Sequence, residues 1–487
     1  MLRAQFTLGR RRPARTLRGI IIHQPVQAAE GRGLVADLGP EAARAKVQSA
    51  FGDIRAEFER LVRIPSVSAN DFDGACVRES AEATASWLAR SGFEDSQLLE
   101  VEGAHPAVYA AAPGPPGSPT VLLYAHHDVQ PPGHEELWQS RPFEPTERDG
   151  RLFGRGSADD KAGIAVHVAA LRAWQGNPPL NLAVFIEGEE EIGSANLPEF
   201  LRRYKDLIRA DTVVIPDCSN WAIGEPALIT SLRGLVDCMV EVRTLDFAVH
   251  SGKYGGPIPD ALTALCRLIA TLHDSSGNAA VAGLHTDLPH SVAVAAPDLR
   301  ETVGLRPDVQ FIGEGSLSHR LWARPAITVL GIDAPSVTNS SHKLVPVARA
   351  SISARLAPGD DAQRAFQALK AHLERHAPWG TKAKVTPIRQ GEPYRIKTDG
   401  QAFDAFRRAC VETWGHEPVE VGSGGSLPLV AALADAYPEM ALLLTGVDDP
   451  DSKAHSENES VHLGDLLNCC VNEALLLGYL AEGSGDG

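Results

Sequence analysis

The chain has 487 residues, which favours two domains over one compact core. Hydrophobic residues make up 44% and charged residues 22%, as in ordinary globular proteins, and the net charge of −16 argues against a nucleic-acid or anionic-membrane partner. The seven cysteines are odd in number and show no CxxC spacing, so we expect no disulfide framework and a reducing, cytoplasmic compartment.

The first segment, residues 1–40, differs from the rest of the chain because it is rich in arginine and poor in acidic residues. A targeting peptide is one interpretation, but the apolar run Gly19–Ile22 is short and no clear small-residue cleavage site follows it. We therefore expect a disordered extension, or a start codon placed too early, and exclude this segment from the fold. No apolar run reaches the ~18 residues that a membrane span needs.

Two helices are predicted to open the folded part. The first covers Ala42–Ile64 and ends where Pro65 makes continuation costly. The second covers Cys76–Ser91, with apolar residues at helical spacing and Gly92 suited to its C-terminal cap. A short apolar strand, Val121–Ala125, then leads into polar residues.

Those polar residues are His126, His127 and Asp128. Residues two apart on a strand share a face, so His126 and Asp128 can point the same way. A carboxylate behind a histidine commonly fixes its tautomer for metal binding. A single histidine after a strand is more often structural, but the pair favours a metal site, with either His126 or His127 as the ligand.

The glycine-rich stretch Gly154–Lys161 brings Asp159 and Asp160 together before an apolar helix over Ala162–Trp174. Aspartate is a favoured helix N-cap, so capping alone would explain one of the pair. The other could bind metal.

An acidic run follows the apolar strand Leu182–Ile186 and includes Glu187, Glu189, Glu190 and Glu191. Carboxylates crowded this tightly raise one another's pKa unless a cation sits among them. For the run alone, a solvated acidic turn is the more common interpretation. Its position after a core strand, where open α/β sheets bind ligands, makes a ligand site an equally good interpretation, so the other candidate ligands must decide.

Two further apolar strands are followed by candidate ligands: Thr212–Pro216 by Asp217, and Met440–Thr445 by a loop that contains His455. Two histidines among several carboxylates suit zinc or a similar divalent ion, and the carboxylate count allows a pair of ions. A calcium-binding module is disfavoured because calcium prefers oxygen ligands.

The character changes between about Thr230 and Gln390, where strands that alternate are interleaved with helical patterns. We therefore expect an α/β catalytic domain with a mostly parallel central sheet flanked by helices, plus an inserted smaller α+β domain. The predicted boundaries are 41–229 and 390–487 for the two catalytic parts and 230–389 for the insertion.

Taken together, these motifs resemble the di-zinc peptidase family that includes carnosinase-type dipeptidases, aminoacylase and succinyl-diaminopimelate desuccinylase, with the carnosinase-like branch most similar. The resemblance runs from about Ala42 to Leu480. It is carried by YAHHDVQP at Tyr124–Pro131, LWQSRPFEP at Leu137–Pro145, GRGSADDKAG at Gly154–Gly163, EGEEEIGS at Glu187–Ser194 and AHSENE at Ala454–Glu459.

The resemblance implies roles for individual residues. Asp159 would bridge two divalent ions, most simply zinc, with manganese or cobalt as alternatives. Asp128 would orient a histidine ligand, and Glu190 would be the general base that acts on a metal-bridged water. The full ligand set would be His126, Asp159, Glu191, Asp217 and His455.

For the inserted domain the resemblance implies a lid that also forms a homodimer. His250, in FAVHSGKYGG, would reach the partner subunit's active site and steady the oxyanion. Arg355, together with Gly425 and Ser426 of the GGSLP loop, would hold the substrate carboxylate. Ser423 departs from the glutamate often found there, which leaves the substrate preference open.

An aspartate at position 217 resembles the aminopeptidase and dipeptidase branch, whereas glutamate accompanies carboxypeptidases and deacylases. We therefore expect a zinc-dependent dipeptidase that acts on small peptides. The alternative is an N-acyl or N-carbamoyl amino-acid amidohydrolase with the same di-metal site. A non-catalytic homologue would have lost Glu190 or a ligand, and every matched position is filled.

Overall fold

The computed structural model describes residues 39–425 and 427–482. Most of the predicted N-terminal extension, and Ser426, lie outside the described residues. No helix in the described part of the chain is long and apolar enough to cross a membrane.

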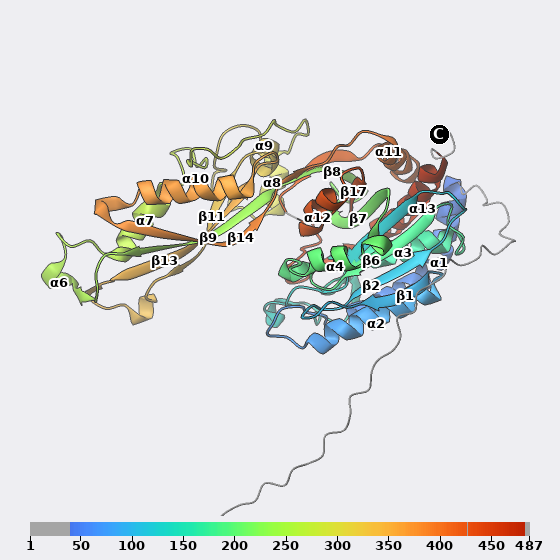
Figure 1. Cartoon of the computed structure of the whole chain (residues 1–487), viewed down its shortest axis with the longest axis horizontal. Coiled ribbons are helices and arrows are strands. Elements are labelled where there is room, and N and C mark those ends of the chain that lie inside the picture. The colour runs from blue at the N-terminus through green and yellow to red at the C-terminus, as the bar shows by residue number, and fades with distance from the viewer. Residues whose placement is uncertain (1–38, 426, 483–487) are drawn as a thin grey trace, which may run out of the picture. The chain divides into compact units, whose positions relative to one another are not determined.

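The larger of the described sheets has nine strands, in the order β1-β2-β6-β3-β7-β17-β8-β15 with β16 beside β8 (Figure 1). Its centre, β6-β3-β7-β17, is parallel throughout, while β2 on one side and β8 on the other run antiparallel to it. The strands are β1 (Glu94–Leu99), β2 (Ala107–Ala112), β3 (Thr120–His126), β6 (Asn181–Glu187), β7 (Thr212–Ser219), β8 (Ala227–Leu232), β15 (Tyr394–Arg395), β16 (Val419–Ser423) and β17 (Ala441–Asp448).

Helices cover this sheet and explain why its central strands are apolar without a break. The helix α3 is buried along nearly its whole length because it packs on β3 and against α1 and α13. The residues from Leu182 to Ile186 of β6 are all buried, as expected for a strand covered on both faces. The helices are α1 (Pro40–Val62), α2 (Gly74–Arg90), α3 (Lys161–Ala173), α4 (Leu197–Arg203), α5 (Lys205–Ile208), α11 (Gln401–Trp414), α12 (Pro428–Ala436) and α13 (Leu463–Glu482).

The second main sheet has four antiparallel strands in the order β11-β13-β9-β14. Alternate residues of β9, including Val236, Cys238 and Val240, enter a separate hydrophobic core with α7 and α10. The elements are β9 (Gly234–Arg243), β11 (Ala326–Asp333), β13 (Val347–Leu356), β14 (Lys382–Gly391), α7 (Ala261–Ala270) and α10 (Ala362–Arg375).

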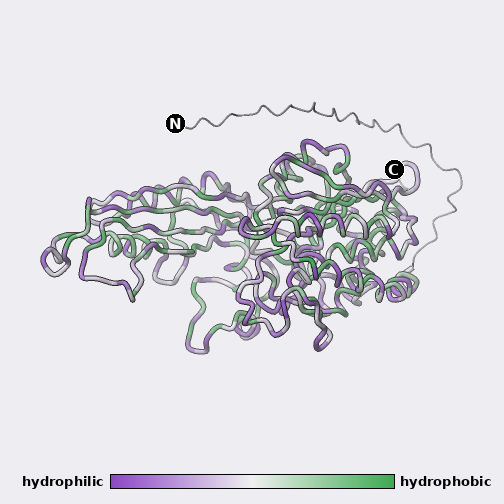
Figure 2. The backbone as a smooth tube through the Cα atoms, turned by 90° about the horizontal axis from the view of Figure 1, so that it is seen from below, coloured by the Kyte–Doolittle hydropathy of each residue, from purple (hydrophilic) through white to green (hydrophobic). Residues whose placement is uncertain are grey.

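Shorter elements complete the described chain. Figure 2 shows that hydrophobic and hydrophilic stretches alternate along the backbone. The short elements are β4 (Thr146–Arg148), β5 (Arg151–Phe153), β10 (Val249–His250), β12 (Lys343–Leu344), β18 (Ser460–His462), α6 (Ser251–Tyr254), α8 (Ala296–Thr302), α9 (Leu317–Trp322), and the 3₁₀ turns η1 (Glu135–Leu137), η2 (Glu190–Ile192), η3 (Val337–Asn339) and η4 (Pro378–Gly380).

The structure confirms the predicted fold class. A mostly parallel sheet flanked by helices carries the strands expected from the apolar runs, and a separate antiparallel sheet occupies the region expected to be inserted. The domain boundaries at 230 and 389 stay a prediction.

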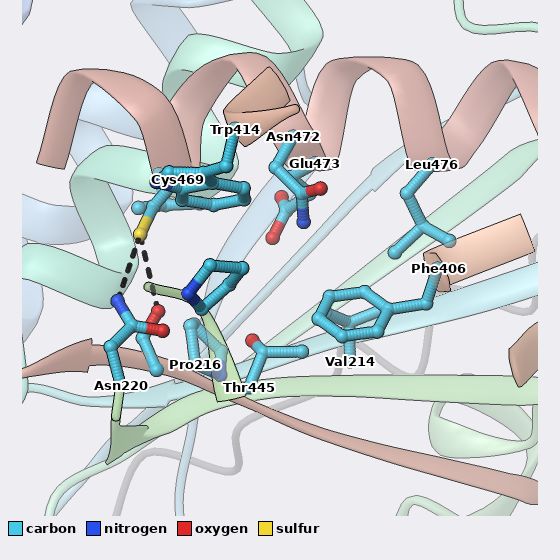
Figure 3. A pocket seen from close by; sticks show the side chains of 13 residues that line it. Val214, Pro216, Asn220, Phe406, Trp414, Thr445, Cys469, Asn472, Glu473 and Leu476 are labelled. Atoms are coloured by element: carbon cyan, nitrogen blue, oxygen red, sulfur yellow. Dashed lines mark hydrogen bonds between the residues drawn. The ribbon is translucent and has the colours of Figure 1, made fainter. Parts of the chain in front are cut away.

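A small cavity of about 10 Å³ lies between α3, α11, α13 and the strands β7 and β17 (Figure 3). It is lined by apolar side chains together with polar ones, and Cys469 donates to the Gly446 carbonyl at 3.2 Å; the polar lining residues are Asn220, Trp414, Thr445, Cys469, Asn472 and Glu473. None of the candidate metal ligands lines this cavity, which therefore belongs to the packed core.

Candidate metal centre

The carboxyl ends of the central parallel strands meet at one edge of the large sheet, and two candidate ligands lie there. His126 ends β3 and Asp217 lies near the end of β7, and these strands pair directly. His126 Nε2 is 2.9 Å from Asp159 Oδ1 and 3.8 Å from Asp217 Oδ1. His126, Asp159 and Asp217 thus form one group able to hold a metal ion, with donor atoms within 4.8 Å of one another.

A second group shares Asp159 with the first. His455 Nε2 is 2.9 Å from Asp159 Oδ2 and 3.1 Å from Glu191 Oε2. The donor atoms of these three side chains also lie within 4.8 Å of one another. The two oxygens of Asp159 therefore face two different histidines. This is the arrangement expected of a carboxylate that bridges two ions.

Gln130, four residues after His126, holds Glu191 in place. Gln130 donates from its backbone to Glu191 Oε1 at 3.0 Å and from its side chain to Glu191 Oε2 at 2.8 Å. Only 3% of the Glu191 side chain is exposed. The ligand is thereby oriented by neighbours that are not themselves ligands, a common feature of metal sites.

Asp128 orients His126 and the backbone of Glu190 and Glu191 at the same edge. The His126 Nδ1 atom is 3.0 Å from the Asp128 carbonyl oxygen and 3.5 Å from its carboxylate. With Nδ1 donating, the lone pair of Nε2 is free to bind metal. The Asp128 carboxylate accepts hydrogen bonds from Ser68 Oγ at 2.7 Å and from the backbone of Glu190 and Glu191 at 3.3 and 3.2 Å.

The sequence did not decide which member of each neighbouring pair, His126 or His127 and Asp159 or Asp160, is the candidate metal ligand, and the structure does. His127 turns away from the ligand groups, and its Nε2 is 2.9 Å from the Pro106 carbonyl oxygen. Burial lowers the pKa of His127 to about 4, so this side chain is a neutral part of the core. Asp160 caps α3 by accepting from the Gly163 backbone, which leaves Asp159 for the metal groups.

The acidic run divides in a similar way. Glu187 accepts a hydrogen bond from the Tyr124 hydroxyl at 2.9 Å, and Glu189 accepts one from the His105 backbone at 2.8 Å. These two buried carboxylates serve the local fold. Glu190 and Glu191, in the turn that follows, lie with the ligand groups.

The electrostatics of the cluster show how strongly it favours positive charge. Contacts with Asp159 and Glu191 raise the pKa of His455 to about 11, although burial opposes this. Burial would lower the pKa of His126, but hydrogen bonds with Asp128 and Asp159 raise it well above its ordinary value. Burial and the Asp159 charge raise the pKa of Glu191 to about 7.

This donor set fits a pair of divalent ions. The set comprises two imidazole nitrogens, each close to a different oxygen of Asp159, and three carboxylates, and these ligand types suit zinc. The raised pKa values of both histidines show that the cluster favours positive charge, which a metal ion would supply.

Glu190 lies beside the ligands without belonging to either group. Its pKa is raised well above the ordinary value, chiefly by burial and also by Asp217, Glu191 and Asp159, while His126 lowers it. A carboxyl group with a raised pKa is better suited to hold and release a proton than an ordinary carboxylate is.

The residues predicted to contact substrate are less closely gathered. His250 is exposed on β10 and its Nδ1 accepts a hydrogen bond from the Gly252 backbone at 3.1 Å. Arg355 is partly buried on β13, and Gly425 is exposed after β16. In the described part of the chain, no hydrogen bond or ion pair joins these residues to the ligand groups, and Ser426 lies outside the described residues.

Several supporting residues were not predicted from the sequence. Ser68 and Gln130 hold Asp128 and Glu191. Lys161 is fully buried, and its Nζ donates to the Leu61 and Ile64 carbonyls at the end of α1. Gln130 and Lys161 lie inside the motifs quoted above, and that position was the only signal that could have pointed to them.

A mostly parallel sheet with this ligand cluster at its strand ends, joined to an antiparallel sheet, defines a metal-dependent hydrolase. The model of Peptidase family M20/M25/M40 matches residues 122–477, and the chain belongs to this family. The resemblance predicted from the motifs is thereby confirmed.

Two named relatives of this chain are dipeptidases, a narrower class than metal-dependent hydrolases. The cysteinylglycine-S-conjugate dipeptidase of Corynebacterium striatum is 34% identical over 371 residues, which cover 74% of this chain and 81% of the relative. The human Beta-Ala-His dipeptidase is 27% identical over 431 residues, covering 83% and 82%.

Solved structures share the fold. The dipeptidase Dug1p of Saccharomyces cerevisiae has a TM-score of 0.79 at 22% identity, covering 92% of this chain and 99% of that one. Human carnosine dipeptidase 1 has a TM-score of 0.78 at 24% identity, covering 91% and 99%.

Proposed function

We propose that this chain hydrolyses the peptide bond of dipeptides or short peptides with two divalent ions, most simply zinc. The observation that carries the proposal is the pair of ligand groups that share Asp159, with Glu190 beside them. One ion would be held by His126, Asp159 and Asp217, and the other by Asp159, Glu191 and His455.

When bound, such ions supply a nucleophile at neutral pH and polarise the scissile carbonyl. The chain's own part is to place the substrate and move protons. Glu190 takes up the proton of the attacking water and returns it to the leaving amine, a role suited to a carboxyl group with a raised pKa. Asp128 fixes the tautomer of His126 and the backbone of Glu190, so both keep their positions during this exchange.

Two observations support dipeptides as the substrate class. Asp217 is the residue type that resembles the aminopeptidase and dipeptidase branch. The named relatives above are dipeptidases, one for cysteinylglycine S-conjugates and one for Beta-Ala-His. We therefore propose a free-amino dipeptide as the substrate.

The lid residues complete the proposal. Arg355, with Gly425 and Ser426, would hold the substrate carboxylate, and His250 would act from the lid of a second copy. Dimerisation through the antiparallel sheet is supported by its edge strand β11, where Leu330 and Ile332 are 60% and 44% exposed. Light scattering of the purified protein should give the mass of a dimer, and a monomer would remove this part of the proposal.

We also propose a cytoplasmic location. All seven cysteines are free in the structure, as expected for a reducing compartment.

The test is hydrolysis of a panel by chelated protein reloaded with zinc, manganese or cobalt. The panel holds free-amino dipeptides, including cysteinylglycine conjugates and β-alanylhistidine, together with N-acetyl and N-carbamoyl amino acids. We expect metal-dependent cleavage of the dipeptides that falls about 10²- to 10⁴-fold in Glu190→Gln.

The control is Glu199→Gln, an exposed glutamate on α4 paired with Arg202, which should keep full activity. Cleavage of only the N-blocked compounds would keep the metal site but overturn the dipeptidase assignment. Activity that survives Glu190→Gln would overturn the role of that residue.

A further inference from the structure

A buried carboxylate in the loop that carries His455 has no role in the proposal so far. Glu459 is 0% exposed and uses both of its oxygens. Oε1 accepts hydrogen bonds from the backbone of Ala158 at 2.9 Å and of Asp159 at 3.1 Å. Oε2 accepts from the backbone of Gly156 at 3.0 Å and from Arg155 Nη1 at 2.6 Å.

Burying this charge is costly, so the arrangement calls for a reason. Burial raises the pKa of Glu459, and Arg155 and the backbone donors oppose that rise. Arg155 is itself 1% exposed, and its Nη2 donates to the carbonyls of Pro131 and Ser456 at 3.2 Å each. A buried ion pair of this kind contributes little net stability compared with apolar packing.

The contacts of Glu459 join two segments that each supply a metal ligand. Its carboxylate holds the backbone of Asp159, the residue shared by both ligand groups. Its own carbonyl accepts a hydrogen bond from Gly154 at 3.0 Å, and it follows His455 by four positions in the chain. The Asp159 loop and the His455 loop are therefore tied together at this point.

The two ligand groups depend on this tie to different degrees. His126 and Asp217 lie on β3 and β7, whose positions are fixed by direct pairing within the parallel sheet. His455 lies in an irregular loop and is 58% exposed. The group of Asp159, Glu191 and His455 thus has two of its three ligands on segments that Glu459 connects.

We propose that Glu459 is a positioning residue that holds Asp159 and His455 in register, and so sets the affinity of the ion bound by Asp159, Glu191 and His455. The ion bound by His126, Asp159 and Asp217 depends on it less. This inference rests on the proposed di-metal function.

The test is calorimetric titration of the metal-free full chain with Zn²⁺, with Co²⁺ absorption as a second probe of each site. Glu459→Gln keeps the size of the side chain but places an amide donor against backbone or arginine donors. We expect wild-type protein to bind two ions in distinguishable steps, and Glu459→Gln to weaken one step about 10- to 100-fold. Excess Zn²⁺ should then restore its turnover, which it would not do for Glu190→Gln.

The matched control is Glu473→Gln, a second buried carboxylate whose Oε1 is 2.8 Å from His167 Nδ1 and which belongs to neither ligand group. It should lower the melting temperature while leaving both zinc steps unchanged. Glu459→Asp keeps the charge on a shorter side chain and should fall between wild type and Glu459→Gln. This variant keeps the test decisive if Glu459→Gln fails to fold.

Unchanged zinc steps in folded Glu459→Gln and Glu459→Asp would overturn the inference and leave the proposed function standing. Equal weakening of both zinc-binding steps would also overturn the inference if it occurred in Glu473→Gln as well as in the Glu459 variants. The effect would then be one of general stability. Failure of the wild-type chain to bind any zinc would overturn both the inference and the proposed function.

Discussion

The carboxyl edge of the parallel sheet and the antiparallel sheet that follows it organise their functional residues in different ways. At the parallel edge, His126 is buried and Asp159 and Asp217 are only 13% and 10% exposed, and the donor atoms of the three side chains lie within 4.8 Å of one another. In the antiparallel region, His250 is exposed, and Arg355 lies partly buried on a strand without a contact to the ligand groups.

The difference follows from how each region is built. Parallel strands covered by helices bring their ends together at one edge, so the ligands converge once the sheet forms. The antiparallel sheet buries one face in its own core and leaves alternate side chains facing outward. The candidate metal ligands therefore converge within the chain, whereas in the proposed function the lid residues would complete their contacts with substrate or a second copy of the chain.

The substitution expected to have the largest effect on the parallel edge is Asp159→Asn, because Asp159 belongs to both ligand groups. We expect activity to fall roughly 10⁴-fold or more, with both zinc ions lost at concentrations that saturate wild type. Elemental analysis after gel filtration would measure the metal content. The control, Asp211→Asn, changes an aspartate that accepts from the Thr120 backbone at the start of β3, and should keep both ions.

On the lid side, Arg355→Lys should raise KM for dipeptides about 10- to 100-fold, because a lysine cannot make the bidentate contact with a carboxylate. Metal content should stay unchanged, which distinguishes this region from the parallel edge. The matched control is Arg349→Lys on the same strand, whose arginine pairs with Glu241 at 2.7 Å. Equal effects of the two substitutions on KM would show that Arg355 has no special part in binding.

The smallest expected effect is the change of zinc affinity with pH. The metal-free pKa of His455 is raised to about 11 and that of Glu191 to about 7, so at neutral pH the metal-free cluster holds protons that the metal-bound cluster does not. Metal binding therefore releases protons, and it strengthens as the pH rises.

The affinity for the ion bound by Asp159, Glu191 and His455 should increase about tenfold per pH unit between about pH 7 and pH 9, where His455 supplies the proton, and more steeply below about pH 7, where Glu191 adds a second. Titration calorimetry in buffers of different ionisation enthalpy would count these protons. An affinity independent of pH would contradict the assigned ligands.

Much of the metal site could be predicted because its ligands follow apolar strands in the sequence. His126 ends β3 and Asp217 lies near the end of β7, and the apolar runs located the strands to within a few residues. Local patterns could not choose between His126 and His127, because the choice depends on the Pro106 carbonyl that accepts from His127.

The supporting residues were beyond prediction for a different reason. The Ser68 and Asp128 side chains are 60 residues apart in the chain, and Glu459 and the Asp159 backbone are 300 residues apart. Such contacts come from tertiary packing and leave no periodic signal in the sequence.

The most direct test of the central claim is a crystal structure of the zinc-loaded protein with anomalous diffraction at the zinc edge. The account predicts two zinc peaks that both contact Asp159, one also touching His126 and Asp217 and the other Glu191 and His455. A single peak, or peaks that do not share Asp159, would contradict it.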